Sequence, residues 1–174
     1  FIRIKLMSSS LREFNENRDF ICKGEILRYG SNNYFSNFSC KSDNRNISAD
    51  LMTTFSKREG EDNLALIKCN PDVDFILIPE LEEIPQFIID YRLLKKEMLE
   101  EYELDGVNFD LGRDKKFETE YNINPYYDLN GVGLLYFAAY PTISDYCESD
   151  YFNELTEINR WEDEYFTEAR DIFY

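Results

Sequence analysis

The residues best suited to chemistry lie in one short loop, Asp128-Leu-Asn-Gly-Val-Gly133, which leads into an uncharged apolar stretch. Its two glycines let the backbone approach a ligand closely. In a helix that follows such a loop, the first-turn N–H groups lack a partner within the helix and lie at the positive end of its dipole. Aimed at a thioester carbonyl, these donors form an oxyanion hole, which contributes about 3–4 kcal/mol per donor.

A carboxylate stands at the start of this loop. Asp128 lies within reach of the same carbonyl and could act as a general base on water, as a nucleophile or as an orienting acceptor. A structural interpretation fits the same spacing, with Asp128 or Asn130 as the N-cap of the helix and Gly131 in a turn. Both interpretations stay open on the residues alone.

The charge and the missing residue types exclude several classes of function. The sequence has no histidine, which excludes Ser-His-Asp and Cys-His catalysis and histidine-ligated zinc within this chain. Lys and Arg number 19 against 35 Asp and Glu, a net charge of −16. Nucleic acid and anionic membrane surfaces are therefore not expected as partners.

The composition is that of a folded protein, with 43% hydrophobic and 16% aromatic residues. We find no apolar run long enough to cross a bilayer and no signal-peptide pattern. The four cysteines lack CxxC spacing, which predicts free thiols in a reducing, cytoplasmic setting. Cys147 stays open as a nucleophile, without a histidine partner.

The first half of the chain alternates apolar and polar residues between Gly, Asn, Asp and Ser turns, which predicts an antiparallel meander; a small barrel fits the same spacing. Pro85 predicts a helix that begins at about Gln86 and packs over the sheet. An exposed amphipathic helix that contacts a membrane or a partner is the alternative, and its acidic face argues against a membrane. Asp105-Gly106 is a turn signal within a polar link. The predicted strands cover residues 1–6, 19–29, 34–41, 47–57 and 64–69.

The second half begins with Phe117–Ile123, which alternates like a strand. No charge occurs from Val132 to Tyr140, so a helix over residues 132–148 would be apolar on every side and would have to be buried. Pro141 would kink that helix. A final strand is predicted from Arg170 onward.

Asp128-Leu-Asn-Gly131, followed by an apolar helix, looks like the active-site segment of hot-dog-fold thioesterases. The whole stretch Asn124–Pro141 and the terminal Arg170–Tyr174 resemble more closely a family of tandem double-hot-dog proteins, which includes the bifunctional acyltransferase/decarboxylase of the leinamycin polyketide pathway. Further segments resemble the strands of that family's first hot dog: Phe1–Leu6, Leu27–Gly30, Tyr34–Ser36 and Ala49–Phe55.

The resemblance implies an α+β hot-dog fold, in which an antiparallel sheet wraps around a long buried helix, with parts of two tandem units in this chain. Residues 1–78 would be the strand-rich back half of the first unit. Residues 79–112 would be a connector with a helix, and residues 113–174 the front half of the second unit. Both ends lie inside strand-like patterns, so we expect a segment of a longer protein.

The family implies an enzyme acting on acyl thioesters of CoA or acyl carrier protein, by acyl transfer with decarboxylation, in polyketide or similar biosynthesis. Thioester hydrolysis and a non-catalytic acyl-binding role stay open. No cofactor or metal is implied beyond the CoA or phosphopantetheine carrier, and hot dogs usually pair, so a homodimer is expected. The family's acyl-carrying tyrosine would lie outside this segment. The expected site residues are Asp128 and Asn130 as catalytic groups, and Gly131, Val132, Gly133 and Tyr136 as substrate-binding groups.

A charge of −16 should repel both CoA phosphates and an acidic carrier protein. A binding site for either one therefore needs a local basic patch. The candidates for that patch are Arg3, Lys5, Lys23 and Arg28.

Overall fold

The chain forms two compact units in a computed structural model. One unit comprises residues 1–111 and 167–174, and the other residues 112–166. In sequence, the second unit is thus an insertion into the first, whereas the sequence-based segments ended at 78 and 112. The structure describes residues 2–9, 14, 17–60, 62, 65–70, 77–112, 114, 117–155 and 167–173.

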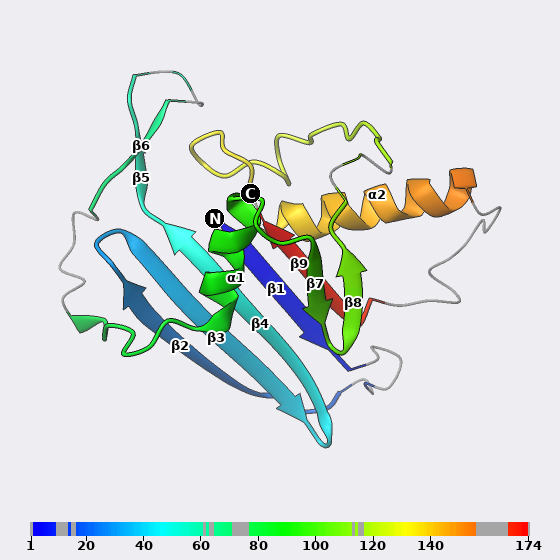
Figure 1. Cartoon of the computed structure of the whole chain (residues 1–174), viewed down its shortest axis with the longest axis horizontal. Coiled ribbons are helices and arrows are strands. Elements are labelled where there is room, and N and C mark those ends of the chain that lie inside the picture. The colour runs from blue at the N-terminus through cyan, green and yellow to red at the C-terminus, as the bar shows by residue number, and fades with distance from the viewer. Residues whose placement is uncertain are drawn as a thin grey trace. The chain divides into compact units, whose positions relative to one another are not determined.

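A five-stranded antiparallel sheet dominates the first unit (Figure 1). Its strand order is β2-β3-β4-β1-β9, so β1 lies between β4 and the last strand of the chain. The expected meander is confirmed for β2, β3 and β4, and the sheet is open rather than a closed barrel. The strands are β1 (Arg3–Ser8), β2 (Ile21–Tyr29), β3 (Asn33–Ser42), β4 (Arg45–Thr54) and β9 (Ala169–Phe173).

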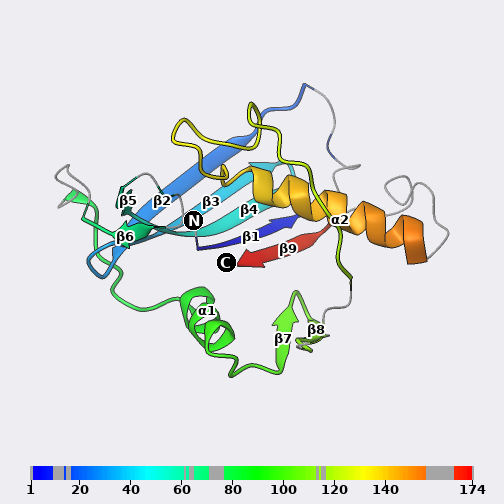
Figure 2. The ribbon, with the colours of Figure 1, turned by 90° about the horizontal axis from the view of Figure 1, so that it is seen from above.

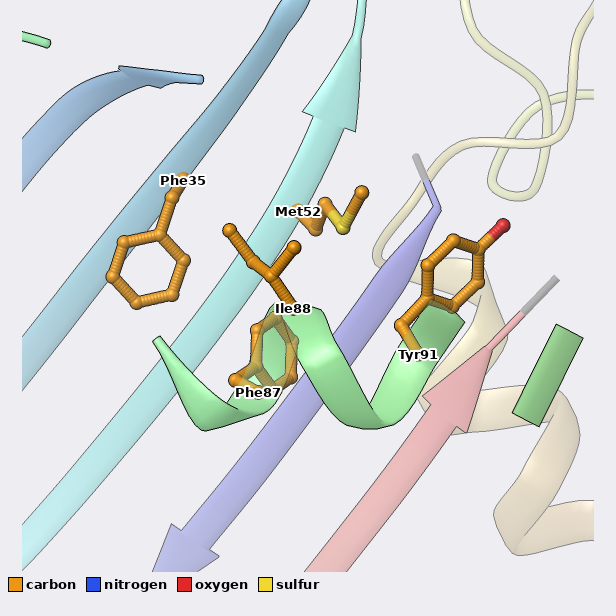
Figure 3. Close-up of a cluster of buried hydrophobic side chains, with 5 residues drawn as sticks. All are labelled: Phe35, Met52, Phe87, Ile88 and Tyr91. Atoms are coloured by element: carbon orange, nitrogen blue, oxygen red, sulfur yellow. The ribbon is translucent and has the colours of Figure 1, made fainter. Parts of the chain in front are cut away.

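Helix α1 (Gln86–Lys95) covers one face of this sheet. It begins at the predicted residue because Pro85 holds an extended conformation just before it. Figure 3 shows Ile88, which is fully buried, pointing toward Phe35 and Met52 on the sheet. Phe35 and Met52 are opposite one another in the β3–β4 register. This layer of helix on sheet is the hydrophobic core of the unit.

Two small hairpins complete the first unit. One pairs β5 (Ser56–Arg58) with β6 (Leu66–Lys68), and the other pairs β7 (Glu101–Leu104) with β8 (Val107–Asp110). Asp105 and Gly106 both have positive φ, 52° and 78°, as the tight turn of the second hairpin requires. The sequence signalled this turn, but its hairpin was missed. Figure 2 shows this hairpin on the same side of the sheet as α1.

The second unit contains α2 (Ala139–Leu155) and the irregular segment before it. The prediction of a buried helix over residues 132–148 is wrong. The helix begins seven residues later, with Pro141 in its first turn, where a missing N–H costs nothing. Ala139 is its only buried residue among those the structure describes. Residues 117–124 form neither helix nor strand, so the strand predicted there is also wrong.

The fold class is therefore α+β, as predicted. None of the helices in the described ranges has the length and apolar character needed to cross a membrane.

Candidate functional site

Asp128 closes a tight turn in the second unit. Asp128 is 5% exposed. Its Oδ2 accepts hydrogen bonds from the Asn124 N–H at 2.6 Å and the Tyr121 hydroxyl at 3.2 Å. The Asp128 N–H donates in turn to the Asn124 carbonyl at 2.9 Å. Sequence reasoning singled out Asp128 but missed both partners. The signal was the Asn124-Pro125 pair four residues upstream, since Asn-Pro favours turn initiation.

Asn130 organises the rest of the loop. Its side-chain Oδ1 accepts the N–H groups of Val132 and Leu134, each at 3.0 Å. Its own carbonyl accepts the N–H of Gly133 at 2.9 Å, and Gly133 has a positive φ of 76°. Asn130 N–H donates to the Leu134 carbonyl at 2.8 Å. The amide side chain thus holds a compact reverse turn.

This geometry corrects the predicted donor set. Val132 and Gly133 already donate to Asn130, and neither lies in the first turn of α2. The physical reason is that an Asn side chain offers nearby N–H groups local hydrogen bonds that compete with a helix. Neither Asp128 nor Asn130 caps α2, which begins at Ala139. Gly131 lies at the exposed tip of the turn, with open space where a Cβ would be.

Aromatic side chains cover the outside of the same loop. Tyr126 is 92% exposed and Tyr127 80%, while Tyr136 is 44% exposed and lies 4.7 Å from the ring of Phe137. Asp128 is the single charged residue from position 122 to position 140, and it is buried. The loop therefore presents an uncharged, largely aromatic surface in a chain of net charge −16.

Tyr121 keeps its proton beside this carboxylate. Burial raises the pKa of Tyr121, and its hydrogen bond to the negative Asp128 raises it further. Tyr121 also packs edge-on against Tyr146 of α2, with ring centroids 5.4 Å apart. The phenol thus remains a donor to Asp128 across the neutral range and ties the loop to the helix.

The four cations expected to form a basic patch do not form one. Arg3 is fully buried and bonds to Asp171, and Arg28 pairs with Glu80 at 2.8 Å. By strand alternation, Arg28 also points to the opposite sheet face from Lys23. Lys5 lies on β1, separated from β2 by two strands.

Arg3 instead joins four elements of the first unit. Its Nε donates to Asp171 Oδ1 at 2.8 Å and a second nitrogen donates to Asp171 Oδ2. The remaining guanidinium bonds go to the Phe87 carbonyl at 2.6 Å and the Tyr102 hydroxyl at 2.7 Å. Burial lowers the pKa of Arg3, but the hydrogen bond and charge of Asp171 outweigh that effect and leave it raised. Burial raises the pKa of Tyr102.

The prediction of four free thiols is also corrected. Cys22 and Cys40 lie directly opposite one another on β2 and β3 and form a disulfide. Two cysteines on paired strands can be direct neighbours whatever their separation in the sequence. The lack of a CxxC motif therefore does not exclude a disulfide. Cys69 and Cys147 are free thiols.

No protein-family model matches the sequence, and no curated protein matches it. Within the described ranges, His, Cys, Asp and Glu side chains do not gather into a group of three that could hold a metal ion.

Proposed function

We propose that this chain handles acyl thioesters of CoA or acyl carrier protein, and that residues 124–137 of the second unit bind the acyl group. The observation that carries the proposal is the uncharged aromatic surface of this loop, built on a backbone fixed by Asp128 and Asn130. An apolar acyl chain gains free energy from burial against such a surface. The resemblance to tandem hot-dog proteins supports the same substrate class.

In its catalytic form, the proposal is acyl transfer with decarboxylation, or thioester hydrolysis. Both hydrogen bonds that described residues give to Asp128 end on Oδ2, so Oδ1 is the oxygen suited to accept a proton from an attacking group. The acyl-carrying nucleophile then comes from outside this segment.

A non-catalytic acyl-binding domain is the second candidate. It is favoured by one observation: the N–H groups of Val132 and Gly133 are used inside the loop. N–H groups that already donate hydrogen bonds within the loop cannot also donate to a thioester oxyanion. Binding without turnover is the behaviour that such a loop supports.

Titration calorimetry and intact-mass analysis test the proposal. The full-length protein is incubated with acetyl-CoA, malonyl-CoA and methylmalonyl-CoA, and free CoA is followed. An acyl adduct with loss of CO2 supports acyltransferase/decarboxylase chemistry, free acid without an adduct supports hydrolysis, and binding without turnover supports the binding domain. Neither binding nor turnover with any of the three would contradict the proposal.

Two variants link the outcome to the loop. Val132→Asp places a charge on the exposed surface, since Val132 is 61% exposed, and should weaken acyl binding without unfolding the unit. Asp128→Asn tests the proton-accepting role. Asp110→Asn, an exposed carboxylate on β8 of the other unit, is the matched control and should change neither binding nor turnover.

A further inference from the structure

Strand β2 forms one edge of the five-stranded sheet (Figure 1). In the described part of the chain its pairing is confined to β3 on one side and, on the other, to a bridge between Arg28 and Glu80. The first six residues of the strand are exposed, including Ile21 at 69% and Ile26 at 48%. An exposed edge strand with unpaired backbone N–H and C=O groups is a template for another strand.

The bridge shows which backbone groups point outward. The Arg28 N–H donates to the Pro79 carbonyl at 2.8 Å, and the Arg28 carbonyl accepts the Leu81 N–H at 3.0 Å, so both groups of Arg28 point away from β3. Because backbone direction alternates with a period of two, Cys22, Gly24 and Ile26 present their N–H and C=O groups at the same edge.

The disulfide independently confirms this alternation. Cys22 and Cys40 have Cα atoms 4.0 Å apart, the close approach of a pair that exchanges no backbone hydrogen bonds with each other. The backbone groups of Cys22 must then face away from β3. The backbone groups that point away from β3 therefore belong to Cys22, Gly24 and Ile26. At Arg28, the segment at residues 79–81 already forms hydrogen bonds with this edge.

We propose that β2 pairs antiparallel with β2 of a second copy of this chain, about a two-fold axis at Gly24. This register sets Lys23 opposite the partner's Glu25 and Glu25 opposite the partner's Lys23. It also sets Cys22 opposite the partner's Ile26 and Ile21 opposite the partner's Leu27, so apolar residues meet apolar residues. The sequence Ile21–Leu27 is thus complementary to itself in both charge and hydropathy.

Two features of the strand support this register. Within the sheet, Lys23 and Glu25 face Ser39 and Asn37 on β3, so neither charge has an opposite charge as its cross-strand neighbour there. The partner supplies that neighbour for both residues, four charges in two pairs across the interface.

The ends of the strand match as well. β2 begins at Ile21, so the partner strand ends opposite Leu27, one residue before the Arg28 bridge occupies the edge. At the centre, Gly24 lets the two backbones approach, and the Phe38 ring lies over it, where a Cβ would come within 2.7 Å of the ring. The pairing would join two sheets through their β2 edges.

Charge reversal tests the pairing by sedimentation equilibrium. Lys23→Glu and Glu25→Lys each turn both cross-interface pairs into like charges and should each raise the dimer dissociation constant at least about tenfold. The double variant Lys23→Glu/Glu25→Lys restores both pairs and should dimerise as the wild type does. An equimolar mixture of the two single variants should form a heterodimer. Both side chains are exposed, so none of these variants threatens folding.

Hydrogen exchange gives a second test, because amide protection reports backbone pairing and does not change through electrostatic attraction alone. On dimerisation, the amides of Cys22, Gly24 and Ile26 should gain protection, whereas those of Lys23 and Glu25, which already face β3, should not change. A wild-type chain that stays monomeric at about 1 mM, or a dimer that leaves the three outward amides unprotected, overturns the proposal. So does a mixture of the single variants that remains monomeric. Acyl binding plays no part in these measurements, so they are independent of the proposed function.

Discussion

Removing the carboxylate of Asp171 should strongly destabilise the first unit. Arg3 is fully buried, and two of its four hydrogen bonds go to this carboxylate. Each hydrogen bond to a charged group contributes about 1.5–3 kcal/mol. Removing one partner of a buried ion pair leaves the other charge buried and unpaired, which costs about 3–5 kcal/mol. Asp171→Asn should therefore lower the free energy of unfolding by about 3–5 kcal/mol.

The assay is urea unfolding followed by circular dichroism, with hydrogen exchange at the β1 and β9 amides to assign the loss to this unit. At a slope of about 1–3 kcal/mol per molar urea, the midpoint should fall by roughly 2 M. The matched control is Glu80→Gln. Its partner Arg28 is 34% exposed and Glu80 is 60% exposed, so breaking that pair should cost less than about 1 kcal/mol.

A double replacement distinguishes the cost of leaving Arg3 as an unpaired buried charge from a general loss of packing. Arg3→Met with Asp171→Leu removes both charges, and similar exchanges of buried ion pairs for apolar residues are often neutral. The double variant should be more stable than Asp171→Asn alone. If Asp171→Asn costs less than about 1 kcal/mol, or if the double variant is no more stable than the single one, the reasoning about this pair is refuted.

Three further predictions concern the same unit. Ile88→Ala should cost about 2–5 kcal/mol in urea unfolding, because Ile88 is 0% exposed at the centre of the helix–sheet core; a cost below 1 kcal/mol would mean that the core is not packed as described. Reduction of the Cys22–Cys40 disulfide by dithiothreitol should lower stability by about 3 kcal/mol, because the bond closes a loop of 18 residues; an unchanged melting temperature would contradict this. Stability should also fall as the pH rises above about 10, because burial raises the pKa of Tyr102 in the folded state, which then holds a proton that the unfolded chain has lost. Tyr102→Phe should flatten that alkaline slope in a pH series of unfolding curves, and an unaltered slope would exclude Tyr102 as its source.

The elements predicted correctly share a strong local signal. The strands of the first unit alternate apolar and polar residues between turns, and Pro85 fixed the start of α1. The predicted buried helix over 132–148 failed because the uncharged run was interpreted by hydropathy alone. The Asn130 side chain and the positive φ of Gly133 compete locally with helix formation there.

In the candidate site and in the first unit alike, contacts between residues close in sequence could have been anticipated, and contacts between distant residues could not. Asn124 lies four residues from Asp128 and bonds to it, so that turn was within reach of sequence reasoning. Arg3 and Asp171 are 168 positions apart. Only the pairing of β1 with β9 brings them together, and no pattern in either strand specifies its neighbour. Arg3 was accordingly assigned to a surface patch.

The pairing of β1 with β9 has a consequence for the nascent chain. At about 5–20 residues per second, the ribosome needs on the order of 10–30 s to make the residues that separate Arg3 from Asp171. After β4 has been made and until β9 follows, β1 has only β4 beside it, with one edge unpaired and the Arg3 guanidinium without its carboxylate. The sheet is therefore completed only after the inserted unit has been synthesised, and until then the unpaired edge of β1 is open to pairing with another strand.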